Sequence, residues 1–127
     1  MESTKTILCY GDSNTWGYIP GSAERYAPDI RWPGVVRQHL GEKFAVIEEG
    51  LNGRTTVWDD PFKPGRNGLS LLIPTLDSHR PIDLLVLMLG TNDLKHYHGV
   101  YAADAARGVN LIIETILNSA TGPASDA

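Results

Sequence analysis

The hydrophobic positions of the chain form three short apolar runs, at residues 6–10, 44–47 and 84–89. A glycine follows each run within a few residues. The third run is continuous rather than alternating, which is typical of a strand buried on both faces of a parallel sheet. The pattern therefore predicts three parallel strands, each ending in a glycine-containing turn.

Three other segments have the spacing of amphipathic helices. Residues 32–40 place Pro33 in a first turn, where its fixed backbone suits a helix start. A second helix is predicted around 69–76, with a kink at Pro74, and a third over 102–118. The alternation of strands and helices predicts an α/β fold in three layers, α/β/α and flavodoxin-like, with a parallel sheet.

Composition and charge narrow the class of protein. A length of 127 residues predicts one domain, and 11 Lys+Arg against 15 Asp+Glu give a net charge of −4. With no Lys/Arg cluster and no apolar stretch of the roughly 18 residues that cross a bilayer, we expect no nucleic-acid and no membrane partner. The single cysteine, Cys9, and the lack of a signal-peptide pattern predict a cytoplasmic protein.

Polar residues gather directly after each apolar run. Ser13 follows the first run near a helix start, Gly53 follows the second, and Asn92 follows the third, with Asp93 next to it to cap or brace the loop. Taken alone, each motif indicates an ordinary turn. The carboxyl ends of parallel strands meet at one edge of a sheet, so we expect the three to converge. Together they predict a serine nucleophile with three oxyanion donors: the N–H of Ser13, the N–H of Gly53 and the amide of Asn92.

At this point the sequence resembles the SGNH hydrolase superfamily, also called GDSL-type esterases. The matching segments read ILCYGDSNTWG, EEGLNGRTT and LMLGTND, and the resemblance extends over residues 7–118. The additional segments DDP and RNG, with Lys95 after GTND, are most similar to small bacterial arylesterases and acyltransferases. The resemblance implies the SGNH form of the fold, with Ser13 as nucleophile and with Gly53 and Asn92 completing the oxyanion hole. It further implies a substrate-binding set of Asp12, Trp16 and Lys95, the last two lining the acyl pocket or its entrance.

The function implied by the resemblance is hydrolysis or acyl transfer of short-chain or aryl esters, without a cofactor. Four scattered histidines and one cysteine have no metal-ligand spacing, so we expect no metal. The resemblance also implies a homo-oligomer. A binding or assembly module without catalysis is the alternative, and a nucleotide or phosphate binder is a third hypothesis, which lacks a glycine-rich phosphate motif.

A catalytic base is the missing part. A serine hydroxyl needs a histidine oriented by a carboxylate, and the family supplies both from a D-x-x-H motif near its C-terminus. We expect this motif to be missing from the chain, and the segment after Asn118, which contains no histidine, has the composition of a loop. His96 and His98 follow the third strand on the correct rim, whereas His39 and His79 are expected to interact with helix dipoles. We therefore expect residues 1–127 to be the N-terminal portion of one SGNH domain of about 200 residues, with the remaining strands on a complementing C-terminal fragment and the third strand exposed at the sheet edge.

Overall fold

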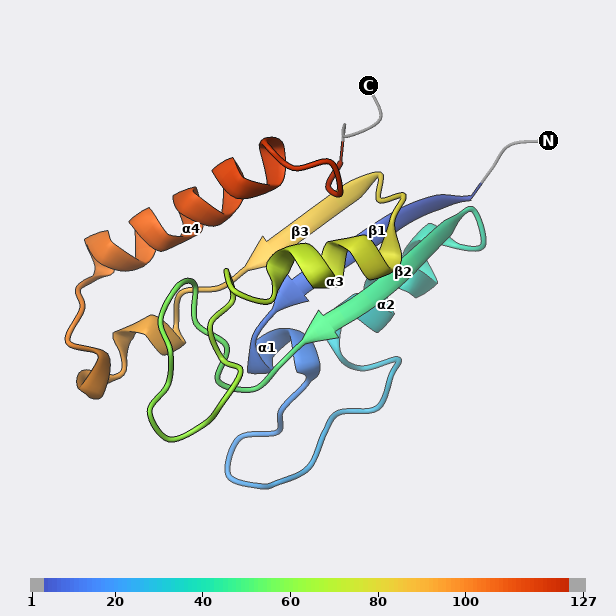
Figure 1. Cartoon of the computed structure of the whole chain (residues 1–127). Helices are drawn as coiled ribbons and strands as arrows, with labels where there is room; N and C mark the ends of the chain where they lie inside the picture. Colours follow the sequence, from blue (N-terminus) through green and yellow to red (C-terminus); the bar gives the residue numbers. More distant parts are fainter. Residues whose placement is uncertain (1–3, 124–127) are drawn as a thin grey trace.

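The computed structural model describes residues 4–123, so residues 124–127 of the expected C-terminal loop lie outside the described part. Its three strands form one parallel sheet in the order β2-β1-β3. The long loops between α1 and α2 and between β2 and α3 lie beyond the arrowheads of the strands (Figure 1). The elements in chain order are β1 (Lys5–Gly11), α1 (Ser13–Trp16), α2 (Trp32–Leu40), β2 (Phe44–Gly50), α3 (Leu72–His79), β3 (Leu84–Met88), the 3₁₀ turns η1 (Asn92–Leu94) and η2 (His96–His98), and α4 (Ala102–Leu117).

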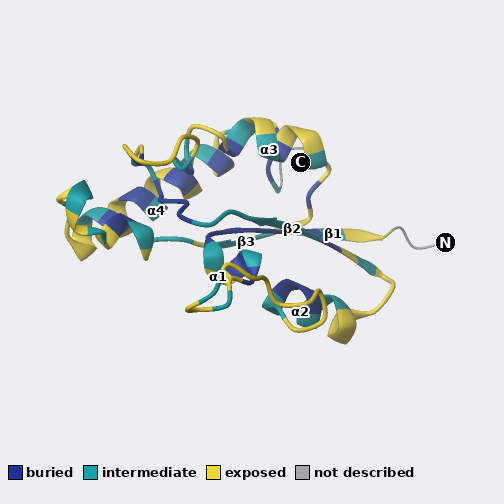
Figure 2. Cartoon of the chain, turned by 90° about the horizontal axis from the view of Figure 1, so that it is seen from below, coloured by how far each residue is buried: buried dark blue, intermediate teal, exposed yellow. Residues whose placement is uncertain are grey.

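The helices cover the two faces of the sheet. Figure 2 shows α1 and α2 on one face and α3 and α4 on the other. The α/β class, the parallel sheet and the three layers expected from the sequence are confirmed. No helix within residues 4–123 has both the length and the apolar character needed to cross a membrane.

The central strand β1 divides the core into two clusters, because successive side chains of a strand point to opposite faces. Leu8 and Tyr10 are fully buried on the side of α3 and α4. Cys9 is fully buried in the cluster that includes Trp32 and Val36 of α2. Because β1 has apolar side chains on both of its faces, the helices of both layers pack against this one strand.

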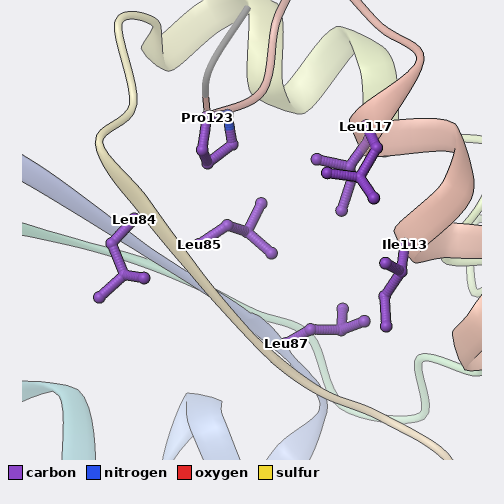
Figure 3. A pocket seen from close by; sticks show the side chains of 7 residues that line it. Leu84, Leu85, Leu87, Ile113, Leu117 and Pro123 are labelled. Carbon is purple, nitrogen blue, oxygen red and sulfur yellow. The ribbon is translucent and has the colours of Figure 1, made fainter.

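Strand β3 is less buried than its sequence predicts. Leu84 is 52% exposed and Met88 is 39% exposed, so the expectation of burial on both faces was wrong. The reason is topological: β3 pairs with β1 on one side, and no described strand pairs with its other side. The expected exposed apolar edge is therefore present. Next to it lies an apolar groove of about 290 Å³ (Figure 3), lined by Leu84, Leu85, Leu87, Ile113, Ile116, Leu117 and Pro123.

The helix bounds agree with the spacing except at α3. This helix covers Leu72–His79, so it begins later than the predicted start at residue 69. Pro74 is consequently its third residue rather than an interior one. The first N–H groups of a helix have no acceptor within the helix, so proline there removes no hydrogen bond, and the predicted kink is not required.

Candidate active site

The turn after β1 presents Ser13 at the start of α1. Asp12 is the N-cap: its carboxylate accepts a hydrogen bond from the Asn14 N–H at 3.0 Å and is 1% exposed. Ser13, the first residue of the helix, is half-buried. A first-turn N–H lacks an acceptor within the helix, so this position suits a donor to an oxyanion. Burial raises the pKa of Asp12, against the opposing effects of the Asn14 hydrogen bonds and the charge of Arg54.

Two glycines let α1 lie directly against the sheet. A Cβ added to Gly11 would lie 2.1 Å from Thr15 Oγ1, and one added to Gly50 would lie 2.3 Å from the backbone N of Trp16. Glycine at the ends of β1 and β2 is therefore what allows α1 to pack this closely. Because Ser13 is the first residue of α1, this packing determines where Ser13 lies relative to the carboxyl ends of the strands.

The turn after β2 carries Gly53 in a left-handed conformation, with φ +84°. The turn is closed by a hydrogen bond from Arg54 N–H to the Leu51 carbonyl at 3.1 Å. It is joined to the first motif by the Leu51 N–H, which donates to the Gly11 carbonyl at 3.2 Å. Gly53 and its turn thus lie beside the end of β1.

The turn after β3 is joined to the Gly53 turn by two side chains. The Asn92 Nδ2 donates to the carbonyl of Arg54 at 3.0 Å. Asp93 is fully buried, and its carboxylate accepts from the Thr56 N–H at 2.9 Å and from Trp58 Nε1 at 3.1 Å, as well as from the Thr56 hydroxyl. The prediction that Asp93 braces its loop is confirmed. The structure brings the three predicted motifs together, while the oxyanion roles of their residues stay predictions.

The three predicted substrate-binding residues have defined partners. Asp12 is occupied as the cap of α1. Trp16 is half-buried, with the Arg25 guanidinium 4.6 Å above its ring and its carbonyl accepting from Arg25 Nε at 2.7 Å. Lys95 Nζ lies 3.9 Å from the buried carboxylate of Asp60. Their contact with substrate stays a prediction.

The expectation that the chain lacks an Asp-x-x-His motif was wrong as to spacing, because Asp93 and His96 have this spacing in the turns after β3. Both carboxylate oxygens of Asp93 accept hydrogen bonds from Thr56 and Trp58. His96 is exposed, and its ring contacts that of Tyr97 at a centroid distance of 5.6 Å. Among residues 4–123 no hydrogen bond joins this histidine to Asp93, so the spacing does not form an oriented base here.

The other histidines have different surroundings. His79 Nε2 lies 2.7 Å from Glu49 Oε1, so this side chain pairs with a carboxylate at the end of β2, whereas the sequence suggested only the helix dipole. His98 Nε2 is buried and has no hydrogen-bond partner among the described residues. Within residues 4–123 no group of three or more His, Cys, Asp or Glu side chains is arranged to hold a metal ion.

Two charged residues, Arg54 and Glu48, have roles that the sequence did not reveal. Arg54 belongs to the matching segment EEGLNGRTT. It is 5% exposed and donates hydrogen bonds to carbonyls at the ends of two strands. Glu48 lies in β2 and accepts from Arg31 Nε at 2.6 Å and Arg37 Nη2 at 3.1 Å, with Arg25 at 4.0 Å. Two signals in the sequence could have identified them. Glu48 is a charged residue within an apolar strand, and Arg54 is a charged residue directly after a glycine turn.

The Glu48 cluster predicts a pH-dependent stability. Burial would raise the pKa of Glu48, but the hydrogen bonds and charges of Arg31 and Arg37 hold it below the ordinary value of 4.5. The stabilisation is therefore complete above pH 4.5 and is lost as the pH falls through the lower folded value. Glu48→Gln is expected to lower the free energy of unfolding by about 2 kcal/mol at pH 7, and the difference from wild type should shrink below pH 4.5. Urea unfolding at pH 7 and pH 3.5 measures it.

Glu42→Gln is the matched control, because Glu42 is exposed. It should change the free energy of unfolding by less than about 0.5 kcal/mol at either pH. A Glu48→Gln difference that stays constant from pH 7 to pH 3.5 would contradict the assigned role of the Glu48 carboxylate.

Comparison with known proteins identifies the family. Residues 9–125 match the model of the GDSL-like lipase/acylhydrolase family. The inhibitor-bound aryl esterase of M. smegmatis is 47% identical, with TM-score 0.90, over 94% of this chain and 60% of that one. Est24, a carbohydrate acetylesterase from Sinorhizobium meliloti, is 39% identical, with TM-score 0.90, over 95% of this chain and 60% of that one. AlinE4, an SGNH-hydrolase family esterase, is 26% identical, with TM-score 0.66, over 92% and 55%.

The chain spans about 60% of the length of the M. smegmatis aryl esterase and of Est24. The matched region contains all three motifs, from Ser13 through Gly53 to Asn92. Sequence, sheet topology and family model agree. The chain belongs to the GDSL-like lipase/acylhydrolase family of SGNH hydrolases.

Proposed function

We propose that this chain is the nucleophile-bearing part of a serine esterase that acts on short-chain or aryl esters. The observation that carries the proposal is the hydrogen bond from Asn92 Nδ2 to the carbonyl of Arg54, directly after Gly53. It links the turns after β2 and β3, and the Leu51–Gly11 hydrogen bond links them to the Ser13 turn. The similarity to an aryl esterase and to a carbohydrate acetylesterase supports the same chemistry.

In the proposed reaction, Ser13 Oγ attacks the ester carbonyl carbon while its proton passes to a base. The carbonyl π electrons move to oxygen, and the oxyanion is stabilised by the N–H groups of Ser13 and Gly53 and by the Asn92 amide. Collapse of this intermediate breaks the ester C–O bond, and the departing alkoxide takes the proton from the base. Water or an alcohol then removes the acyl group by the reverse sequence. No step requires a cofactor.

The base and its carboxylate are proposed to come from a complementing segment that pairs with β3. Two features support this: the free edge of β3 within the described residues, and the apolar groove between β3 and α4 (Figure 3). A strand on that edge would fill the groove with apolar side chains and cover Leu84 and Met88. A homo-oligomer is a second way to cover this surface. Burial raises the pKa of Cys9 to about 11. This single free cysteine suits the reducing cytoplasm that we propose.

Chemical complementation tests the proposal. Imidazole in solution can replace a missing histidine base, so it should accelerate acetylation of Ser13 by para-nitrophenyl acetate. Mass spectrometry of the digested protein locates the acetyl group. Ser13→Ala is expected to abolish labelling of this peptide, whereas Ser78→Ala, at an exposed serine of α3, should leave it unchanged.

The alternative, a binding or assembly module, has one observation in its favour. Among residues 4–123 no hydrogen bond joins the Ser13 hydroxyl to a histidine. The same experiment separates the two functions. Labelling of Ser13 that depends on imidazole supports the esterase, and absence of any Ser13 acetylation at saturating imidazole supports the module.

A further inference from the structure

We propose that Arg54 is a positioning residue that holds the three predicted oxyanion donors in one arrangement. The inference rests on the proposed function, because it concerns the same site. Arg54 follows Gly53 directly and is the residue at which the three turns meet.

The side chain of Arg54 connects the ends of two strands. Its Nη1 donates to the carbonyl of Gly11 at 3.0 Å and to the carbonyl of Glu49 at 2.6 Å. Its guanidinium lies 4.1 Å above the ring of Tyr10, whose hydroxyl donates to the Gly68 carbonyl at 2.7 Å. Gly11 precedes the Asp12–Ser13 turn, so Arg54 fixes the point at which the nucleophile turn leaves β1.

The main chain of Arg54 connects the other two donors. Its N–H closes the turn that contains Gly53, and its carbonyl accepts from Asn92 Nδ2 at 3.0 Å. With one hydrogen of the Asn92 amide committed to this carbonyl, the direction of the other is set. Arg54 therefore bonds Gly11, two positions before Ser13, and also accepts a hydrogen bond from Asn92. It is the next residue after Gly53.

The positive charge of Arg54 also favours the ionised form of the buried carboxylate of Asp12, the cap of α1. A lysine keeps this charge but presents a single nitrogen on a flexible stem, without the planar fork that bonds and stacks at once. A methionine keeps similar length and loses both the charge and the donors. Arg54→Lys therefore removes part of the Arg54 interactions, and Arg54→Met removes both the charge and the hydrogen bonds.

The test compares Arg54→Met and Arg54→Lys, with Arg37→Lys as the matched control. Arg37 also donates to a β2 carbonyl, that of Val46 at 2.8 Å, but from α2 and away from the rim. The first measurement is the ¹⁵N–¹H spectrum of the chain, following the side-chain amide of Asn92 and the backbone amide of Gly53. The second is the imidazole-dependent acetylation rate of Ser13.

Arg54→Met is expected to move both NMR signals and to slow acetylation by about 100-fold. Arg54→Lys should recover part of the rate, and Arg37→Lys should leave the two signals and the rate unchanged. Unmoved Asn92 and Gly53 signals in a folded Arg54→Met chain overturn the proposal. If that variant does not fold, wild-type signals and rate in Arg54→Lys overturn it instead. If wild type itself is not acetylated, the proposed function fails, and the NMR comparison alone still decides the role of Arg54.

Discussion

Asp93→Ala is expected to lower the free energy of unfolding by about 4 kcal/mol, because it strands several buried donors at once. The carboxylate is fully buried and accepts from the Thr56 N–H, the Thr56 hydroxyl and Trp58 Nε1. Each buried donor left without an acceptor costs about 1–3 kcal/mol. Urea unfolding at pH 7, followed by circular dichroism, measures the change as a shift of the midpoint.

Two controls separate this effect from the loss of any aspartate. Asp93→Asn keeps the shape and one acceptor oxygen, so it should cost about half as much. Asp77→Ala removes an exposed carboxylate that lies 3.4 Å from Arg80, and it should cost less than about 0.5 kcal/mol. If Asp93→Ala shifts the midpoint no more than Asp77→Ala does, Asp93 does not join the turns as described.

Gly50→Ala is expected to lower the free energy of unfolding by about 3 kcal/mol and to slow Ser13 acetylation by about 100-fold. The added Cβ would lie 2.3 Å from the Trp16 N and 2.7 Å from the Trp16 Cα. These are backbone atoms, so relief requires α1 to move and Ser13 to move with it. Urea unfolding and the acetylation rate are measured on the same variant.

Ala45→Val provides the comparison, since it adds methyl groups to the same strand at an exposed position. It should leave the acetylation rate unchanged and the free energy of unfolding within about 0.5 kcal/mol of wild type. A Gly50→Ala variant that is destabilised yet acetylated at the wild-type rate would show that the contact between Gly50 and α1 supports stability without setting the position of Ser13.

The strands and helices were predictable because their signals are local. The apolar runs gave β1, β2 and β3, and the spacing of residues 32–40 gave the bounds of α2. Where a local signal has two explanations, the run of residues alone does not decide between them. The continuous run at 84–89 is apolar enough for burial on both faces, yet Leu84 is half exposed, because burial depends on neighbouring strands and not on the run itself.

The convergence of Ser13, Gly53 and Asn92 at one edge also followed from the sequence, since parallel strands carry their carboxyl ends together. The residues that hold these turns in place did not. Arg54 and Asp93 have partners 37 to 43 positions away in the sequence, and no local pattern records such a partner. The Asp93–His96 spacing is a further example. It resembles a catalytic-base motif in the sequence, but in the structure the Asp93 carboxylate accepts hydrogen bonds from Thr56 and Trp58.

The sequence by itself therefore determined the α/β class, the order of elements, the family and the three motifs at the sheet edge. These features depend on the periodicity of apolar residues and on short sequence segments, both of which are local properties of the chain. Only the tertiary structure decided which groups are buried, which carboxylates are paired and which strand forms the open edge. Burial and pairing are properties of atoms brought together from distant positions, and their energies arise only when water has been removed from between them.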